Sequence, residues 1–363
     1  MKKAICVIFA AAILLSLTTF ASAAVETKFY GYQWLRYNYN VTGGSYATAG
    51  NNYFSIPRTY LRWKFTDADA GYEGNLTLDI NNTNGGQGVT TTGVAGAIDW
   101  ASWLKKASVD FTKIPFLSDI DALIRVGQQD VYFGTIDTWQ YPVIEKAIED
   151  KQSIVSSADQ GIALIGKIPA GYGGYEMAIY NGTGYKDVPN DGTGAAANLT
   201  DKAYDASLLI TPIAGLYARL SYFHKILSVL NAHPTLGYNS TAVVVGGATG
   251  PIEGFVEYVT LVNAKNYLAG TTSGVSVGVS GYLGIKLTDM FTLCGRVDTY
   301  NPDTQKKNDE KNMYTAGVNI KLADKITLQL DYQLDANRYP GYGTGDNNLK
   351  NANQWMTQLV WNW

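Results

Sequence analysis

Asn353-Gln-Trp-Met-Thr-Gln-Leu-Val-Trp-Asn-Trp363 is the stretch of this sequence that decides the fold. In an extended strand its large apolar side chains share one face: Trp355, Leu359, Trp361 and Trp363. The opposite face is polar: Gln354, Gln358 and Asn362. An apolar face opposed to a polar one is typical of a wall with lipid outside and water inside. A soluble sheet seldom uses three tryptophans in one strand, so the stretch predicts an outer-membrane β-barrel.

The beginning of the sequence predicts export. Met1-Lys2-Lys3 is basic, residues 4–20 are apolar, and Ala21-Ser22-Ala23 fits the small-x-small rule for cleavage. We therefore expect residues 1–23 to be a signal peptide and residues 24–363 to form a single barrel domain in the outer membrane. The alternative is an uncleaved anchor, because the apolar run approaches the length that spans a bilayer.

The composition agrees with a membrane barrel. Glycine (38) and tyrosine (26) are abundant, and only 16% of the residues are charged. Without Lys2 and Lys3, 26 basic residues stand against 31 acidic ones, a net charge of −5, which gives no sign of nucleic-acid binding. After cleavage Cys294 is the one remaining cysteine, so no internal disulfide is expected. No motif has metal-ligand spacing, and we expect neither a metal nor a cofactor.

Strand-like alternation recurs along the mature chain. In residues 53–66 the apolar face carries Leu61, Trp63 and Phe65. The opposite face is basic, with Arg58, Arg62 and Lys64. Sixteen such segments are predicted, at residues 28–40, 53–66, 72–81, 100–112, 121–131, 162–168, 172–180, 202–211, 216–226, 241–247, 252–263, 275–287, 291–300, 312–322, 325–335 and 353–363. The count depends on 241–247 and 252–263, where the alternation is weakest.

The connections between these segments alternate in length. The short ones are at 67–71, 169–171, 212–215, 288–290 and 323–324. The long polar ones are at 41–52, 82–99, 181–201, 301–311 and 336–352. Bacterial outer-membrane barrels have even strand numbers, tight periplasmic turns and longer external loops. We predict an all-β fold, a transmembrane antiparallel β-barrel of about 16 strands with both termini on the periplasmic side. The polar inward faces argue against a dry β-sandwich core.

One connection lacks the pattern. Residues 132–161 show no strand-like alternation, and a stretch this long is uncommon unless it has a function. Pro142 is placed to open a short helix with one shared face, formed by Ile144, Ala147, Ile148 and Lys151.

The chain at this point resembles the general bacterial porins, over its whole mature length in architecture. The resemblance is sharpest at Arg125-Val-Gly-Gln-Gln-Asp-Val-Tyr-Phe-Gly134, where a strand runs into Phe-Gly at the start of a constriction loop. Phosphate-selective porins share a similar stretch. Tyr132 departs from the proline of many relatives, and the Pro-Glu-Phe-Gly-Gly sequence of the best-known members is absent. The resemblance implies a homotrimer in lipid and lipopolysaccharide, a water-filled channel for small hydrophilic solutes and ions, and an inward-folded constriction loop after strand 5.

Charged residues are the candidates for the pore lining. If the loop folds inward, it brings four carboxylates into the lumen: Asp137, Glu145, Glu149 and Asp150. The alternation of the strands points four arginines into the lumen on the facing wall: Arg36, Arg58, Arg62 and Arg125. Opposed charges across a narrow gap create a transverse field that orients dipolar solutes. The alternative is that each charge is merely a solvated lumen residue. Because the four acids belong to the loop that is expected to form the constriction, we expect a weak preference for cations.

Two other functions remain open from the sequence. A barrel hydrolase needs a histidine near a nucleophile, and only His224 and His233 exist, without a serine-nucleophile motif. A structural sheath around a partner protein is the second alternative. The cluster Asp187, Asn190 and Asp191 is a weak calcium signal, since such residues are common in turns. We therefore expect a channel and no enzyme.

Overall fold

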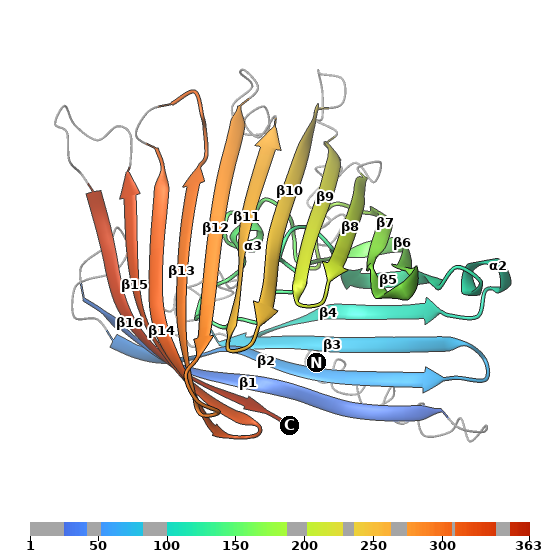
Figure 1. Ribbon diagram of the computed structural model, residues 1–363, viewed down its shortest axis with the longest axis horizontal. Coiled ribbons are helices and arrows are strands. Elements are labelled where there is room, and N and C mark those ends of the chain that lie inside the picture. The colour runs from blue at the N-terminus through green and yellow to red at the C-terminus, as the bar shows by residue number, and fades with distance from the viewer. Residues whose placement is uncertain are drawn as a thin grey trace, which may run out of the picture.

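The computed structural model describes residues 25–41, 52–82, 100–186, 202–227, 236–262, 274–306, 309–338 and 349–363. Across these residues sixteen strands form one closed antiparallel barrel, in which β1 pairs with β16 (Figure 1). The predicted antiparallel β-barrel of about 16 strands is thereby confirmed. The predicted signal peptide, residues 1–23, lies outside the described residues.

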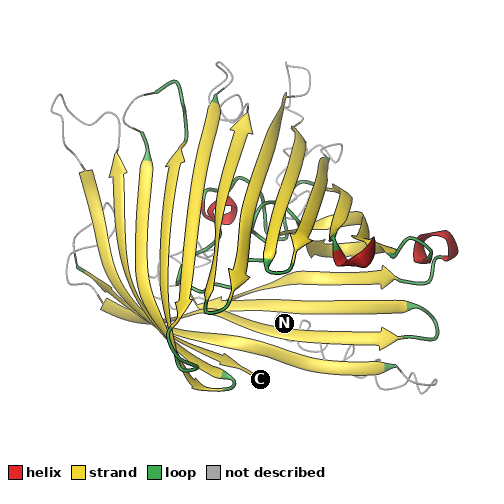
Figure 2. Cartoon of the chain, viewed as in Figure 1, coloured by secondary structure: helices red, strands yellow, loops and turns green. Residues whose placement is uncertain are grey.

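The strands account for most of the described chain (Figure 2). Their bounds are β1 Glu26–Asn40, β2 Asn52–Asp67, β3 Tyr72–Asn82, β4 Trp100–Phe111, β5 Ala122–Asp130, β6 Ala158–Ile168, β7 Gly173–Tyr180, β8 Ala203–Ile213, β9 Leu216–Leu227, β10 Leu236–Thr249, β11 Ile252–Val262, β12 Val275–Lys286, β13 Phe291–Asn301, β14 Lys311–Ala323, β15 Ile326–Arg338 and β16 Leu349–Asn362. Each of the sixteen predicted segments overlaps one of these strands. The two weakest predictions, at 241–247 and 252–263, overlap β10 and β11.

Three short helical turns complete the described elements: α2 Pro115–Ser118, α3 Ile148–Lys151 and the 3-10 turn η1 Pro169–Gly171. None of the helices in the described part of the chain is long and apolar enough to cross a membrane. The helix predicted to open at Pro142 begins instead at Ile148, so that prediction was wrong in position. The Pro142 carbonyl accepts a bond from Asn319 at 2.8 Å, and the Ile144 N–H donates to Asp331, so tertiary bonds replace the first helical turn.

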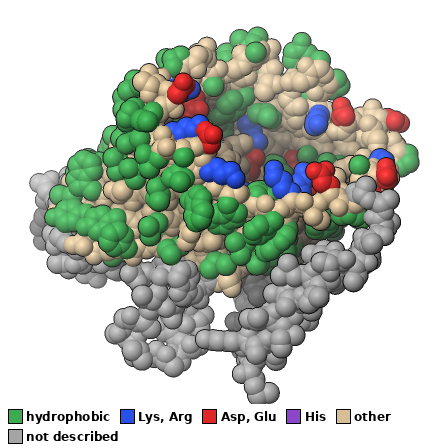
Figure 3. Space-filling model, turned by 90° about the horizontal axis from the view of Figure 1, so that it is seen from below, with side chains coloured by type: hydrophobic (Ala, Val, Ile, Leu, Met, Phe, Trp, Pro, Cys, Tyr) green, Lys and Arg blue, Asp and Glu red, His purple; other side chains and the backbone are tan. Residues whose placement is uncertain are grey.

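The strand faces differ as the alternation predicted. On β10, Val243 and Val245 are 42% and 58% exposed, whereas Val244 between them is 1% exposed. On β16, Trp355 and Trp361 are about half exposed, whereas Gln358 is fully buried. Apolar side chains therefore face outward and polar ones inward, as a wall between lipid and water requires. Figure 3 shows hydrophobic side chains on the flank and charged ones gathered around a hollow.

The barrel closes between its first and last strands. The pairing of β1 with β16 runs from Tyr32 opposite Asn362 to Asn40 opposite Gln354. At the end of this seam Trp363 and Gly31 exchange two backbone hydrogen bonds. A closed barrel leaves no free strand edge, so the backbone groups of the wall are satisfied within the sheet.

Part of the interior is filled by apolar packing. Residues 131–157, called here the β5–β6 segment, contribute Phe133, Ile148 and Ile154 to a buried cluster. The strands supply small inward side chains opposite them: Ala163, Ala178, Ala203 and Ala242. A Cβ on Gly278 of β12 would lie 3.0 Å from the Ile148 side chain. The small residues of β6 to β12 therefore leave the volume that the segment occupies.

Candidate functional site

The β5–β6 segment is hydrogen-bonded to strands far apart in the barrel order. One group of its hydrogen-bond partners lies on strands β8 to β11: Asp205, Ser221, Tyr238 and Glu257. A second group lies on β14 and β15: Asn319, Gln329, Asp331 and Gln333. Its Tyr141 hydroxyl also accepts a bond from Arg58 of β2 at 2.9 Å. A segment that reaches all these strands crosses the space that the barrel encloses.

A cavity of about 500 Å³ lies between this segment and the inner face of the barrel, where β1, β2, β4, β5 and β14 to β16 line it. Four cationic side chains line it: Arg58, Arg62, Lys105 and Lys106. Three carboxylates also line it: Asp130, Asp137 and Asp150. Aromatic side chains complete the wall, among them Tyr32, Trp34, Tyr60 and Tyr141. This cavity is the candidate functional site.

Three of the cations gather around the ring of Tyr60. The guanidinium carbons of Arg58 and Arg62 lie 4.9 and 4.8 Å from its centroid, and the Lys105 ammonium lies 5.2 Å away. The Lys105 ammonium also donates to the Tyr60 hydroxyl at 2.7 Å. The electron-rich face of a ring attracts cations, and this attraction strengthens when water is excluded. Tyr60 therefore holds three basic side chains close together on one wall.

The carboxylates near this cluster do not neutralise it. Arg58 has an ion pair with Asp79 at 3.6 Å, and Lys106 has one with Asp130. Among the described residues neither Arg62 nor Lys105 forms an ion pair, and both are held by aromatic rings. The wall thus carries an excess of positive charge beside the cavity.

Lys105 and Lys106 were missed by the sequence analysis. Thr77 of β3 pairs with Lys106 and Leu78 pairs with Leu104, so Lys105 is an extra residue in β4. Such a β-bulge breaks the strict alternation of faces. Two adjacent lysines therefore line the same cavity, where an ideal strand would send one of them outward.

The loop acid Asp137 is engaged by the opposite wall. Its carboxylate forms a two-pronged ion pair with Arg219 of β9, and both side chains are less than 10% exposed. Arg219 also donates to the Gly134 carbonyl at 2.8 Å. Burial raises the pKa of Asp137, and the nearby Arg219 guanidinium opposes that rise. Asp137 lines the cavity, but its charge is balanced within the wall.

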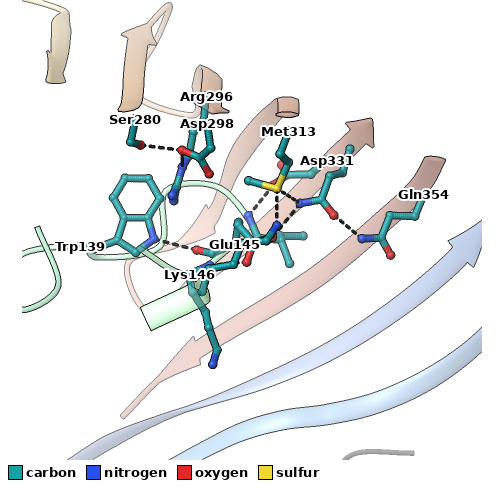
Figure 4. A network of polar contacts seen from close by, with 12 residues as sticks. Trp139, Glu145, Lys146, Ser280, Arg296, Asp298, Met313, Asp331 and Gln354 are labelled. Atoms are coloured by element: carbon teal, nitrogen blue, oxygen red, sulfur yellow. Dashed lines mark hydrogen bonds and ion pairs between the residues drawn. The ribbon is translucent and has the colours of Figure 1, made fainter. Parts of the chain in front are cut away.

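Glu145 and Glu149 do not line the cavity. Glu145 accepts bonds from Lys151 at 2.6 Å and from Gln333 at 2.9 Å, in the network of Figure 4. Burial works against its charge, but Lys151, the Lys146 N–H and Arg296 together outweigh burial and lower the pKa of Glu145. Glu149 is 0% exposed and accepts a bond from the Thr135 N–H at 2.6 Å, and burial raises its pKa.

The remaining predicted residues divide between the cavity and the wall. Asp150 lines the cavity, and its carboxylate lies 3.5 Å from the Lys146 ammonium. Both side chains are partly exposed. Arg36 and Arg125 do not line it. Arg36 donates to Gln358 at 2.9 Å. Arg125 donates two bonds to Asp110, at 2.6 and 2.7 Å, so its charge is balanced inside the wall.

Tyr141 stands where the segment meets the basic wall. Its backbone has a φ of 55°, a left-handed conformation that costs a non-glycine residue about 1–2 kcal/mol. Its hydroxyl is bonded to Arg58, and its ring packs edge-on against Trp34 at 4.8 Å. Gln329 donates to its carbonyl at 2.9 Å. These contacts hold a strained residue in place at one side of the cavity.

The His224 ring bonds to Asn239 at 2.7 Å and stacks on Tyr204, while His233 lies outside the described residues. Within the described ranges no group of three His, Cys, Asp or Glu side chains is arranged to hold a metal ion. The calcium signal of Asp187, Asn190 and Asp191 lies outside those ranges.

No family model and no curated protein matches the sequence. Solved structures do match. The outer membrane channel DcaP of Acinetobacter baumannii has a TM-score of 0.65 at 12% identity, over 94% of this chain and 99% of that one. A loop-deletion mutant of OmpT, an outer membrane protein of Vibrio cholerae, has 0.64 at 10%, over 94% and 100%. An anion-selective porin from Comamonas acidovorans has 0.62 at 9%, over 94% and 100%. Identities this low show a shared fold alone: the chain has the sixteen-stranded barrel of outer-membrane porins.

Proposed function

We propose that this protein is an outer-membrane porin, a passive, non-enzymatic channel for small hydrophilic solutes and ions that prefers anions. The observation that carries the proposal is the cavity of about 500 Å³ lined by Arg58, Arg62, Lys105 and Lys106. The β5–β6 segment serves as the constriction in this proposal, because it spans the interior and leaves the passage along the basic wall.

The preference for anions reverses the expectation from the sequence. That expectation rested on free carboxylates on the loop, but Asp137 pairs with Arg219 and Glu145 pairs with Lys151. Glu149 is buried, and Asp150, with a side chain 23% exposed, is the most exposed of the four loop acids. Arg62 and Lys105 face the cavity without a carboxylate partner among the described residues. Each charge that is not balanced near a narrow aqueous path contributes about 1 kcal/mol, enough to change a permeability ratio several-fold.

The fold supports the membrane setting of this proposal. The large exposed side chains of the strands are apolar, and the inward ones are mostly polar. Export through a cleaved signal at residues 1–23, the outer membrane as location and a homotrimeric assembly all belong to the same proposal. The trimer would bury outward apolar residues of β1 to β5, such as Leu35, which is 46% exposed.

Planar-bilayer recording tests the proposal. The purified, folded protein should insert with stepwise increases of conductance and a nearly linear current–voltage relation. A preparation that shifts on unheated electrophoresis as a folded barrel, yet never conducts, would rule out the porin and favour a hydrolase or a sheath for a partner protein.

A further inference from the structure

Residues 181–186, called here the β7 extension, directly follow β7. Because neighbouring strands are antiparallel, β7 ends at the end of the barrel opposite the short turns at 169–171 and 212–215. The β7 extension contacts β4, although β5 and β6 stand between β7 and β4 in the barrel order. One of its contacts on β4 is Lys105, which lines the basic cavity of the candidate site. The β7 extension therefore lies inside the barrel.

The backbone of the β7 extension is held in place. The Asp159 carboxylate, on a residue of β6 that is 3% exposed, accepts backbone hydrogen bonds from Gly182 and Gly184. Both glycines have a positive φ, of 79° and 78°. A Cβ on Gly184 would lie 2.6 Å from the Ser156 hydroxyl of the β5–β6 segment. Glycine permits both the turn and the close approach, so the chain can bring its next two side chains toward β4.

Tyr185 is the first of these side chains, and it packs beside the basic cavity. The Lys105 ammonium lies 5.4 Å from the centroid of the Tyr185 ring and 5.2 Å from that of the Tyr60 ring. Lys105 thus contacts two rings from distant parts of the chain, and it lines the cavity. The β7 extension borders the passage at this point.

Lys186 is the second, and it brings a further positive charge. Its ammonium lies 5.0 Å from the Trp103 ring and 5.5 Å from the Tyr185 ring. The residue is exposed, and it forms no ion pair with any residue that the structure describes. The ammonium groups of Lys105 and Lys186 both lie within 5.5 Å of the Tyr185 centroid, so at most twice that distance separates them. A ring attracts a cation but does not neutralise its charge.

The carboxylates that act on Lys186 are already paired. Attraction to Lys186 comes from Asp150 and Asp79. Asp150 lies 3.5 Å from the Lys146 ammonium, and Asp79 lies 3.6 Å from the Arg58 guanidinium. The positive charge of Lys186 therefore adds to that of the basic cavity.

We propose that Lys186 captures small anions at the mouth of the channel where β7 ends and passes them to Lys105, while Trp103 and Tyr185 hold its ammonium beside the passage. This inference rests on the proposed function as an anion-preferring porin and adds a binding step before the basic cavity. The ligands are small inorganic anions and carboxylates, because an exposed ammonium attracts a negative group without selecting its shape. One positive charge about 5 Å from the path raises the local concentration of a monovalent anion about twofold at about 0.1 M salt. At about 1 M the screening length falls to about 3 Å, and most of this enrichment is lost.

The experiment measures single-channel conductance of the full protein in potassium chloride at about 0.1 M and about 1 M. Recordings at about pH 6 keep lysine protonated. Lys186→Gln should lower the conductance about twofold at the lower concentration and change it little at the higher one. Lys186→Glu should lower it about fourfold at the lower concentration, because the change of charge is twice as large. Lys186→Arg keeps the charge and should keep the conductance of the unmodified protein at both concentrations.

The matched control is Lys306→Gln. Lys306 follows β13 and so lies at the same end of the barrel, its side chain is 60% exposed, and it does not line the basic cavity. This variant should conduct like the unmodified protein at both salt concentrations.

The outcomes separate the two proposals. Equal losses of conductance in K186Q at the two salt concentrations would show a structural role for Lys186. An unchanged conductance at low salt would show that Lys186 lies away from the path, and an increase would show that its charge repels the ions that carry the current. Each of these results overturns the capture site and leaves a conducting porin. A folded protein without conductance overturns the porin, and the capture site with it.

Discussion

Glu257→Gln is expected to remove a pH dependence from the docking of the β5–β6 segment. Glu149 and Glu257 are both 0% exposed. The Thr135 N–H donates to the two carboxyl groups at 2.6 and 3.1 Å, and the Thr135 hydroxyl donates to Glu257 at 2.8 Å. Two donors cannot satisfy two buried carboxylates, so the pair is favourable while it shares a proton.

The structure sets the size of the effect. The two carboxyl oxygens bond to one nitrogen, so they lie no more than about 6 Å apart. At that separation, with an effective dielectric constant of about 20, two full charges repel by about 3 kcal/mol. Arg296 attracts Glu149, but its Nε is bonded to Asp298. Loss of the shared proton therefore weakens docking about a hundredfold.

The direction follows from the pKa of Glu149, which burial raises above its ordinary value of 4.5. At pH values between the ordinary and the raised pKa of Glu149, the docked segment binds more protons than an undocked one. Docking is therefore strongest below the ordinary value and weakens as pH rises through the window. In the E257Q variant the amide donates a permanent hydrogen bond in place of the shared proton, so docking should respond less to pH than in the unmodified protein.

Single-channel recording from about pH 5 to about pH 9 measures the effect. The unmodified protein should show more frequent current fluctuations as pH rises, and this increase should be smaller in E257Q. The control is Asp289→Asn in an exposed turn: its bond with Lys286 lowers the pKa of Asp289, so it titrates below the range. If E257Q keeps the pH response of the unmodified protein, the shared proton is refuted.

Three further predictions follow from the same structure. Replacing Arg62 and Lys105 together with alanine should lower the preference for chloride several-fold, as measured by reversal potentials. The control is Lys321→Ala, at an exposed lysine paired with Asp324, which should leave the preference unchanged. Equal shifts in the two variants would contradict the assignment of the basic wall. Asp137→Asn leaves the buried Arg219 without its carboxylate partner and should weaken docking of the segment by about 3–5 kcal/mol. The current of this variant should fluctuate at every pH. A variant with a steady current would contradict the role of the Asp137–Arg219 pair in docking. Unheated electrophoresis should show a band near three times the monomer, and monomers alone in mild detergent would contradict the trimer.

Much of the fold was predictable because a barrel strand is a local pattern. Alternation alone located all sixteen strands, including the aromatic and polar faces of β16. The position of α3 was not predictable, since Asn319 and Asp331 bond to the backbone before it from strands remote in sequence. The inward orientation of Lys105 was not predictable either, because it results from a one-residue bulge whose position depends on pairing with the neighbouring strand.

The candidate site was predictable only in part. Arg58, Arg62, Asp137 and Asp150 line the basic cavity, whereas Arg36, Arg125, Glu145 and Glu149 do not. Sequence patterns indicate which side chains face inward, but not which of them are neutralised there. That depends on partners such as Arg219 and Glu257, which lie 82 and 122 residues away from their contacts in the segment. The selectivity that we propose therefore has the opposite sign to the one expected from the sequence.

The reversal potential of the open channel in a potassium chloride gradient tests the central claim most directly. A passage along Arg58, Arg62, Lys105 and Lys106 predicts a potential displaced toward the equilibrium potential of chloride. A potential displaced toward that of potassium would show that the basic wall does not set the selectivity of the pore, and would contradict the account.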